Sequence, residues 1–169
     1  FGVVFQNDTL FKDTIRENIR LGRNLTDEQL LEAARRAQAL EFIEEQGGLD
    51  APVAIKGANL SGGQKQRLLL ARALAGDPDI LLLDDSSSAL DYRTDAKLRE
   101  EIRLHCADAT KIIIAQRISS IMHAEKIMVL ENGNVIGMGT HEELMETCPL
   151  YREIGESQIG EGLAKEVRA

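Results

Sequence analysis

Two adjacent carboxylates follow an apolar run near the middle of the chain, and they are the first candidates for chemistry. The stretch ILLLDD places Asp84 and Asp85 directly after the apolar residues 80–83. A continuous apolar run of this kind is typical of a buried parallel strand. Because ligands bind beyond the carboxyl ends of strands in open parallel sheets, we expect both acids to lie at a ligand-binding edge.

A second candidate is the stretch LSGGQKQR, residues 60–67, which has the composition of an anion site. Ser61 stands at the expected start of a helix, and Gly62 and Gly63 let the backbone approach a ligand closely. A helix that starts here points its first amides and the positive end of its dipole at that ligand. The alternative is an ordinary serine cap followed by two tolerated glycines, because short motifs also occur by chance.

These groups must be positioned by strands and helices, which the hydrophobic pattern predicts. Strands are expected at 1–5, 80–84 and 110–115, and a hairpin closed by Asn132-Gly133 is expected at 126–139. Helices are expected at 24–48, 60–78, 92–105 and 140–148, with a short last helix opening at Pro149. Capping residues mark several helix starts: Thr26 with Gln29, Asp91, and Thr140 with Glu143. The polar tail after Gln158 is expected to fray.

Helices that alternate with buried strands predict an α/β fold, a mainly parallel sheet with helices on both faces. The segment from about Asp8 to Arg67 has almost no strand pattern and is expected to be a helical insertion. Gln6, Asp84 and Gln116 each follow an apolar run, so we expect them to cluster at the carboxyl edge of the sheet.

Composition narrows the class of protein. The net charge is −8, with the basic residues interleaved among acidic ones, which argues against a nucleic-acid-binding surface. Cys106 and Cys148 match no metal-ligand spacing and are expected to be unpaired thiols in a reducing compartment. No apolar run in the sequence approaches the length of a membrane span.

Taken together, the motifs resemble the ATP-binding cassette (ABC) family. The stretches LSGGQKQR, ILLLDD, SALD and IIIAQR follow one another in that family's order and spacing, while FQNDTLFKDTIRENI and GMGTHEELM are similar to its exporter branch. The resemblance extends from Gln6 to about Gln158. It implies a P-loop NTPase-like α/β fold with a helical subdomain at about 8–67, a RecA-like core part at about 68–148, and a C-terminal helix and polar tail at 149–169.

The resemblance also implies a role for each matching residue, with ATP and Mg²⁺ as cofactors. Gln6 matches the Q-loop glutamine, which contacts magnesium and senses the membrane domain. Asp84 matches the Walker B aspartate, which holds magnesium, usually through water. Asp91 matches the D-loop aspartate at the dimer seam. The signature, which contacts the γ-phosphate of ATP held by the opposite subunit, is matched by Ser61, Gly62, Gly63 and Gln64.

Two residues depart from the family pattern at the hydrolytic site. The family generally has a glutamate general base where this sequence has Asp85, whose carboxylate is withdrawn by about 1 to 1.5 Å, and such a displacement can cost about 100-fold in rate. Gln116 stands where the family has a switch histidine, and its amide can donate a hydrogen bond to a phosphate oxygen but cannot carry a proton. Because the signature is intact, these changes predict that the chain's own site is impaired while its signature still serves the opposite subunit's site.

Two further departures concern the helical insertion and the phosphate loop. Exporters often have an acidic residue followed by arginine where VAIKG has Ile55 and Lys56, which puts the implied contact with the membrane domain in doubt. The sequence contains no G-x-x-x-x-G-K-[ST] loop to cradle the phosphates. We therefore expect a core that is incomplete at its N-terminus, a piece of a longer polypeptide, and no ATP hydrolysis by this segment alone.

The sequence thus predicts part of an ABC exporter nucleotide-binding domain, resembling the degenerate half of a heterodimeric multidrug- or lipid-type exporter. Its ATPase activity would belong to the full assembly at the cytoplasmic face of the cell membrane. The expected partners are a second, non-identical nucleotide-binding domain and a transmembrane domain that docks through its coupling helices, with no nucleic acid. Two alternatives stay open: a soluble ABC-type ATPase of DNA maintenance, which would need a long coiled coil that is not visible between Gln6 and Ser61, and a non-hydrolytic module that uses nucleotide only to dimerise.

Overall fold

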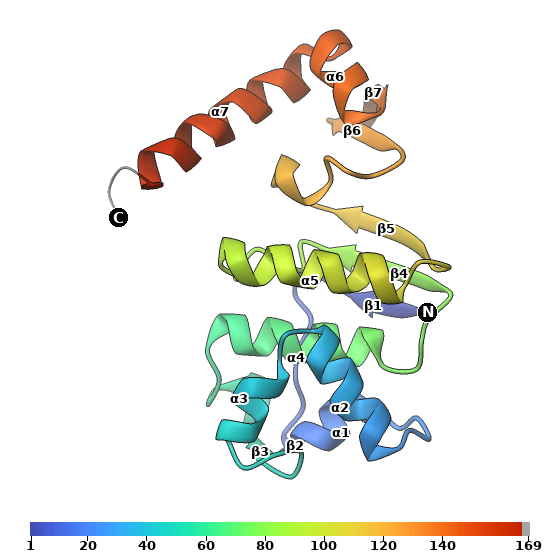
Figure 1. The fold of residues 1–169 in the computed structure, drawn as a ribbon, viewed down its shortest axis with the longest axis vertical. Coiled ribbons are helices and arrows are strands. Elements are labelled where there is room, and N and C mark those ends of the chain that lie inside the picture. Colours follow the sequence, from blue (N-terminus) through green and yellow to red (C-terminus); the bar gives the residue numbers. More distant parts are fainter. Residues whose placement is uncertain (167–169) are drawn as a thin grey trace. The chain divides into compact units, whose positions relative to one another are not determined.

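The computed structural model describes the backbone of residues 1–166 and the side chains through Gln158 (Figure 1). The chain forms two compact units, one spanning Phe1–Ile114 and the other beginning at Ala115. Each unit is described by itself below.

The first unit is built on a parallel sheet of three strands in the order β1-β4-β5. The strands are β1 (Gly2–Val4), β4 (Ile80–Asp84) and β5 (Thr110–Ile114). Both pairings are parallel. The mixed α/β fold with a parallel sheet is therefore confirmed.

The central strand and the edge strand differ in burial. Leu81 and Leu83 of β4 are buried, as its apolar run predicts. The run in β5 predicts a buried strand too, but Ile112 and Ile114 are 47% and 52% exposed. Successive side chains of a strand point to opposite faces of the sheet, and Ile112, Ile113 and Ile114 are all exposed. The burial prediction is therefore wrong for β5, because neither face of the strand is covered at these positions.

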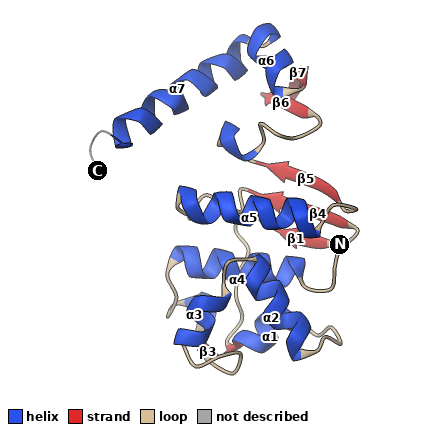
Figure 2. Cartoon of the chain, viewed as in Figure 1, coloured by secondary structure: helices blue, strands red, loops and turns tan. Residues whose placement is uncertain are grey.

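Five α-helices complete the first unit, and Figure 2 shows the first four of them grouped together beside the sheet. They are α1 (Ile15–Arg20), α2 (Asp27–Arg36), α3 (Leu40–Glu45), α4 (Gly62–Leu74) and α5 (Tyr92–His105). Every residue of α4 from Leu68 to Leu74 is buried, so α4 is the central helix of the unit. Leu98 and Ile102 of α5 join the same buried cluster as the β4 leucines.

The single helix predicted at 24–48 is wrong, because α2 and α3 are separated at Gln38. The predicted capping box of Thr26 and Gln29 does start α2. Gln38 adopts a left-handed conformation with φ of 57°, and its carbonyl accepts a 2.7 Å hydrogen bond from the Arg67 guanidinium of α4. The same guanidinium lies 4.8 Å from the ring centroid of Phe42 in α3. A partner from another helix thus stabilises the break, and the local pattern does not reveal it.

The helical insertion also contains two short strands that the sequence pattern missed. β2 (Asp13–Thr14) pairs antiparallel with β3 (Pro52–Val53). Strands of two residues are too short to leave a period-two pattern. A 3₁₀ turn, η1 (Ile55–Gly57), follows β3.

The second unit confirms the predicted hairpin and its turn. It consists of η2 (Ile118–Ser120), β6 (Ile127–Glu131), β7 (Asn134–Gly139), α6 (His141–Thr147) and α7 (Pro149–Glu166). Asn132 and Gly133 have φ values of 49° and 79°, the positive values that a type I′ turn requires. The capping box of Thr140 and Glu143 opens α6 as predicted.

The last helix is longer than predicted. It spans 18 residues and continues through Glu166, so the short helix and the frayed tail after Gln158 are both wrong. Polarity alone does not end a helix, and Tyr151 near its start is buried in the core of this unit. Residues 167–169 lie outside the described part of the chain.

Gly2 is needed at the sheet edge for steric reasons. A Cβ atom at this position would lie 2.2 Å from the carbonyl oxygen of Ala73 and 2.9 Å from Cγ of Pro78. We expect Gly2→Ala to lower the free energy of unfolding by about 2 kcal/mol, as overpacking of a tight contact does, measured as a lower thermal midpoint. Gly155→Ala is the control: its Cβ would meet only flexible side-chain ends of Ile118 and Met145 at 3.4 Å, and an equal loss there would contradict the steric explanation.

Candidate functional site

The carboxyl edge of the sheet holds Asp84 at the end of β4 and Gln6 just after the neighbouring strand β1. Val4 of β1 pairs with Leu83 of β4, so Gln6 and Asp84 both lie just beyond this paired position. Gln6 is exposed and Asp84 is half-buried. Gln116 belongs to the second unit, and its expected place in this cluster stays a prediction.

Asp85 marks a sharp turn at the end of β4. Its φ of 48° is left-handed, a conformation that costs a residue other than glycine roughly 1 kcal/mol or more. Its amide donates to the carbonyl of Ile114 at 2.9 Å. Its own carbonyl accepts from the hydroxyl of Ser88 at 3.0 Å and from the side-chain amide of Gln66 at 3.1 Å. These bonds hold the unfavourable backbone conformation in place.

The helix α4 begins at the predicted anion site. The hydroxyl of Ser61 accepts from the backbone amide of Gln64 at 3.2 Å, and Gln64 Oε1 accepts from the amide of Ser61 at 2.9 Å. This capping box occupies two amides of the first turn, and Gly62 and Gly63 supply the other two. Ser61 and Gly62 are exposed, so the turn can present backbone donors to an anion.

The glycines of this turn also pack against the loop that follows β4. A Cβ atom on Gly63 would lie 3.3 Å from the carbonyl oxygen of Ala89, and one on Gly62 would lie 3.7 Å from the Ala89 side chain. Gln66 Oε1 accepts from the amide of Ala89 at 2.8 Å. The start of α4 and the loop after Asp85 therefore contact each other directly.

Asp91 closes that loop and caps the next helix, as its position in the sequence predicts. Its two carboxylate oxygens accept from the amide and the hydroxyl of Thr94 at 2.9 and 2.7 Å. These hydrogen bonds from Thr94 hold the pKa of Asp91 below its usual value. The loop that begins at Asp85 therefore also fixes the N-terminal end of α5.

A buried arginine joins the segment after Gln6 to α4, and sequence reasoning missed it. Arg72 is 6% exposed. Its guanidinium donates to the backbone carbonyls of Asn18 and Thr9 at 2.8 and 3.0 Å and to Asn18 Oδ1 at 3.2 Å. It lies 3.7 Å from a carboxylate oxygen of Asp8 and 5.4 Å from the ring centroid of Phe11. The sequence does contain a signal for this residue, because Arg72 stands alone among the apolar residues 68–75.

In the second unit, α7 holds the backbone at Gln116. The side-chain amide of Gln158 donates to the carbonyl of Gln116 at 2.7 Å, and its oxygen accepts from the amide of Ile118 at 2.9 Å. The side chain of Gln116 is exposed.

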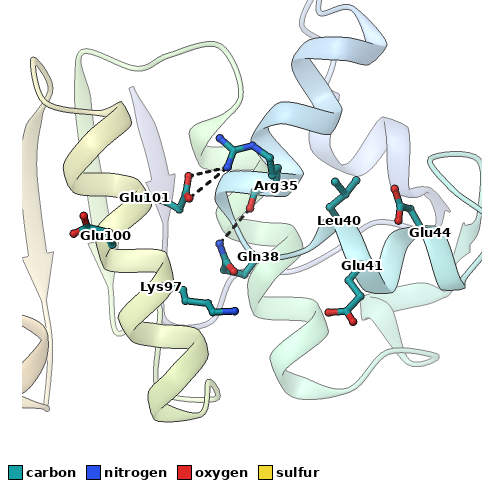
Figure 3. A pocket seen from close by; sticks show the side chains of 8 residues that line it. All are labelled: Arg35, Gln38, Leu40, Glu41, Glu44, Lys97, Glu100 and Glu101. Carbon is teal, nitrogen blue, oxygen red and sulfur yellow. Dashed lines mark hydrogen bonds and ion pairs between the residues drawn. The ribbon is translucent and has the colours of Figure 1, made fainter.

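A separate open cavity of about 590 Å³ lies where α2 and α3 face α5 (Figure 3). Arg35 donates to both carboxylate oxygens of Glu101 across it, at 3.2 and 3.4 Å. The lining is of mixed charge and consists of Arg35, Gln38, Leu40, Glu41, Glu44, Lys97, Glu100 and Glu101. None of the residues predicted to act on a ligand lines it.

Within the described residues, no cluster of three or more His, Cys, Asp or Glu side chains is arranged to bind a metal ion. Magnesium does not need such a cluster, because it binds through one or two carboxylates together with waters and substrate phosphates. The carboxylate of Asp84, the last residue of β4, and the amide oxygen of Gln6, two residues after β1, are suitable ligands for it. No helix in the described part of the chain combines the length and apolar character of a membrane span.

Most of this chain is similar in sequence to known proteins. Residues 1–88 match the sequence model of a family described as "ABC transporter". Over 155 residues, the chain is 44% identical to proteins named "Putative multidrug export ATP-binding/permease protein" from Staphylococcus aureus strains NCTC 8325 and COL. The matches cover 90% of this chain but only 27% of those proteins.

The fold of most of this chain is similar to that of a solved structure. The structure of a bacterial Atm1-family ABC exporter with ATP bound superposes with a TM-score of 0.89 at 38% sequence identity. The superposition covers 94% of this chain and 28% of that one.

Proposed function

Because this chain belongs to the ABC transporter family, we propose that it is part of the nucleotide-binding domain of an exporter that couples ATP binding and hydrolysis to substrate export. The observation that carries the proposal is the exposed start of α4, where Gly62 and Gly63 present backbone amides beside the loop after Asp84 and Asp85. Similarity to multidrug export proteins and to an ATP-bound exporter supports it.

The signature turn would serve a second nucleotide-binding domain. Its backbone amides, reinforced by the positive end of the α4 dipole, suit the terminal phosphate of an ATP held by that partner. Preorganised donors of this kind stabilise charge that develops during phosphoryl transfer without reorganisation. The capping box of Ser61 and Gln64 keeps the turn in this conformation.

The chain's own site would use Gln6 and Asp84 to hold magnesium, which neutralises charge on the phosphates when it is bound. Asp85 would orient the attacking water, but its carboxylate is one methylene shorter than that of glutamate and starts further from the water. Gln116 would donate a hydrogen bond to phosphate without carrying a proton. We propose that this site turns over slowly while the signature remains competent.

This asymmetry calls for a non-identical partner with a complete site. The helical part, about residues 8–67, would contact the coupling helices of a transmembrane domain and place the assembly at the cytoplasmic face of the membrane. The chain spans 27% of the length of its relatives, and the exposed isoleucines of β5 support the covering of this strand's faces by residues outside this sequence.

Substitution of the two neighbouring acids tests the role of each. In the full-length assembly, Asp84→Asn is expected to weaken magnesium-dependent nucleotide binding at this chain's own site by about tenfold or more, because it removes the carboxylate charge that holds the hydrated metal. Asp85→Asn is expected to leave binding nearly unchanged, since that residue faces the water. Equilibrium titration with a fluorescent ATP analogue measures both.

The same titration without magnesium is the control, and Asp84→Asn should have no effect there. Equal loss of affinity in both variants would refute the assignment of metal binding to Asp84 and water orientation to Asp85.

A further inference from the structure

The side chain of Gln66 bridges the loop that begins at Asp85. Its Nε2 donates to the carbonyl of Asp85 at 3.1 Å, and its Oε1 accepts from the amide of Ala89 at 2.8 Å. The donor and the acceptor of this one side-chain amide thus bind opposite ends of the same loop. A glutamine can do this because it carries a donor and an acceptor side by side.

The loop needs such support because its first residue is strained. Asp85 has a φ of 48°, which is unfavourable for a side chain with a Cβ atom. The carbonyl of Asp85 also accepts from the amide and hydroxyl of Ser88, so those bonds are internal to the loop. The bond from Gln66 ties this carbonyl to another element, the helix α4.

That other element is the helix that carries the signature turn. Gln66 lies in α4 about one turn after Gly63, and Gly63 lies so close to the loop that an added Cβ atom would be 3.3 Å from the carbonyl oxygen of Ala89. Close approach at Gly63 and two hydrogen bonds from Gln66 therefore join the same helix to the same loop. Loosening either hydrogen bond leaves the loop free to shift against the signature.

We propose that Gln66 is a positioning residue that fixes the Asp85–Ala89 loop against the signature turn. This inference rests on the proposed function, in which Asp85 lines the chain's own nucleotide site and the signature serves the partner's site. The link makes these two surfaces move as one unit, so the position of the loop in one site sets the geometry offered to the other. Gln66 does not contact nucleotide in this role.

Three variants of the full-length assembly separate the contributions of the two bonds. Gln66→Met keeps the length and helix propensity of the side chain but removes both bonds. Gln66→Glu keeps the acceptor for the Ala89 amide but replaces the donor to Asp85 by a negative charge. Lys65→Ala, on the preceding residue of the same helix, is the control outside the clamp.

Hydrogen exchange of the Ala89 amide tests the clamp itself and requires no nucleotide. We expect exchange to speed up about tenfold in Gln66→Met, the equivalent of one typical hydrogen bond, and to stay near wild type in Gln66→Glu and Lys65→Ala. Unchanged exchange in Gln66→Met would overturn the clamp whatever the protein does with ATP.

Steady-state ATPase activity tests the positioning role. We expect kcat to fall about tenfold or more in both Gln66 variants with KM for ATP nearly unchanged, because geometry is lost and not nucleotide contacts. Faster exchange with normal kcat would overturn the positioning role and leave the proposed function intact. A wild-type assembly without ATPase activity would instead overturn the proposed function and this rate effect together.

Discussion

Gly62→Asp is expected to lower the ATPase activity of the full-length assembly by about 100-fold or more. The substitution places a carboxylate on the exposed first residue of α4, where the backbone amides are expected to meet a γ-phosphate. The substitution leaves the backbone amides in place but sets a like charge beside the phosphate, and we expect this repulsion to cost at least as much as the loss of one preorganised donor to developing charge, which is about 10²- to 10³-fold. Steady-state hydrolysis by the reconstituted pair of nucleotide-binding domains with their membrane domains is the measurement.

Gly62→Ala is the matched control for this experiment. Its Cβ would lie 3.7 Å from the Ala89 side chain, an ordinary contact, and it leaves the amides in place. We expect its activity to remain close to wild type. A comparable loss in Gly62→Ala would mean that the turn tolerates no side chain, and the charge argument would then be wrong.

Asp85→Ala in the same assembly distinguishes a nucleotide-binding domain with an impaired site from one with an ordinary catalytic site. If this chain's own site contributes little turnover, Asp85→Ala lowers activity far less than Gly62→Asp does. Equal losses would mean that Asp85 acts as a full catalytic base, and the proposed impaired site would be refuted. The intact signature would then belong to an ordinary catalytic half.

The features that sequence predicted correctly depend on neighbours close in the chain. The capping box of Ser61 and Gln64 uses residues three positions apart, and the turn at Asn132-Gly133 needs only two residues that tolerate positive φ. The apolar runs of β4 and β5 likewise predict strands, although burial follows for Leu81 and Leu83 of β4 and not for β5. Each of these signals is complete within one short stretch.

The features that sequence missed depend on partners far along the chain. The break at Gln38 is stabilised by Arg67, 29 positions away, and the bonds of Gln66 reach 19 and 23 positions to the loop after β4. No local pattern marks such partners. The capped start of α4 could therefore be predicted from the sequence, whereas the contacts that hold it against the loop could not. The binding of an anion there stays a prediction.

Arg72→Met is expected to lower the free energy of unfolding by about 3 kcal/mol. The guanidinium is buried and donates to two backbone carbonyls and to Asn18 Oδ1. Replacing a buried ion pair by apolar residues is sometimes neutral, but that requires both partners to be replaced. Here the carbonyls of Thr9 and Asn18 belong to the backbone and stay in place, so methionine leaves them without this donor, and Asn18 is buried.

The loss should appear as a thermal midpoint lower by about 6 to 12 °C, the shift expected for a domain of 150 or more residues. Arg103→Met, on the exposed face of α5, removes a surface ion pair with Glu100 and should change the midpoint little. Faster hydrogen exchange at Thr9 and Phe11 should accompany the loss, because Arg72 holds the segment that leads away from Gln6. A midpoint close to wild type in Arg72→Met would show that the segment after Gln6 is held to α4 by its apolar contacts alone.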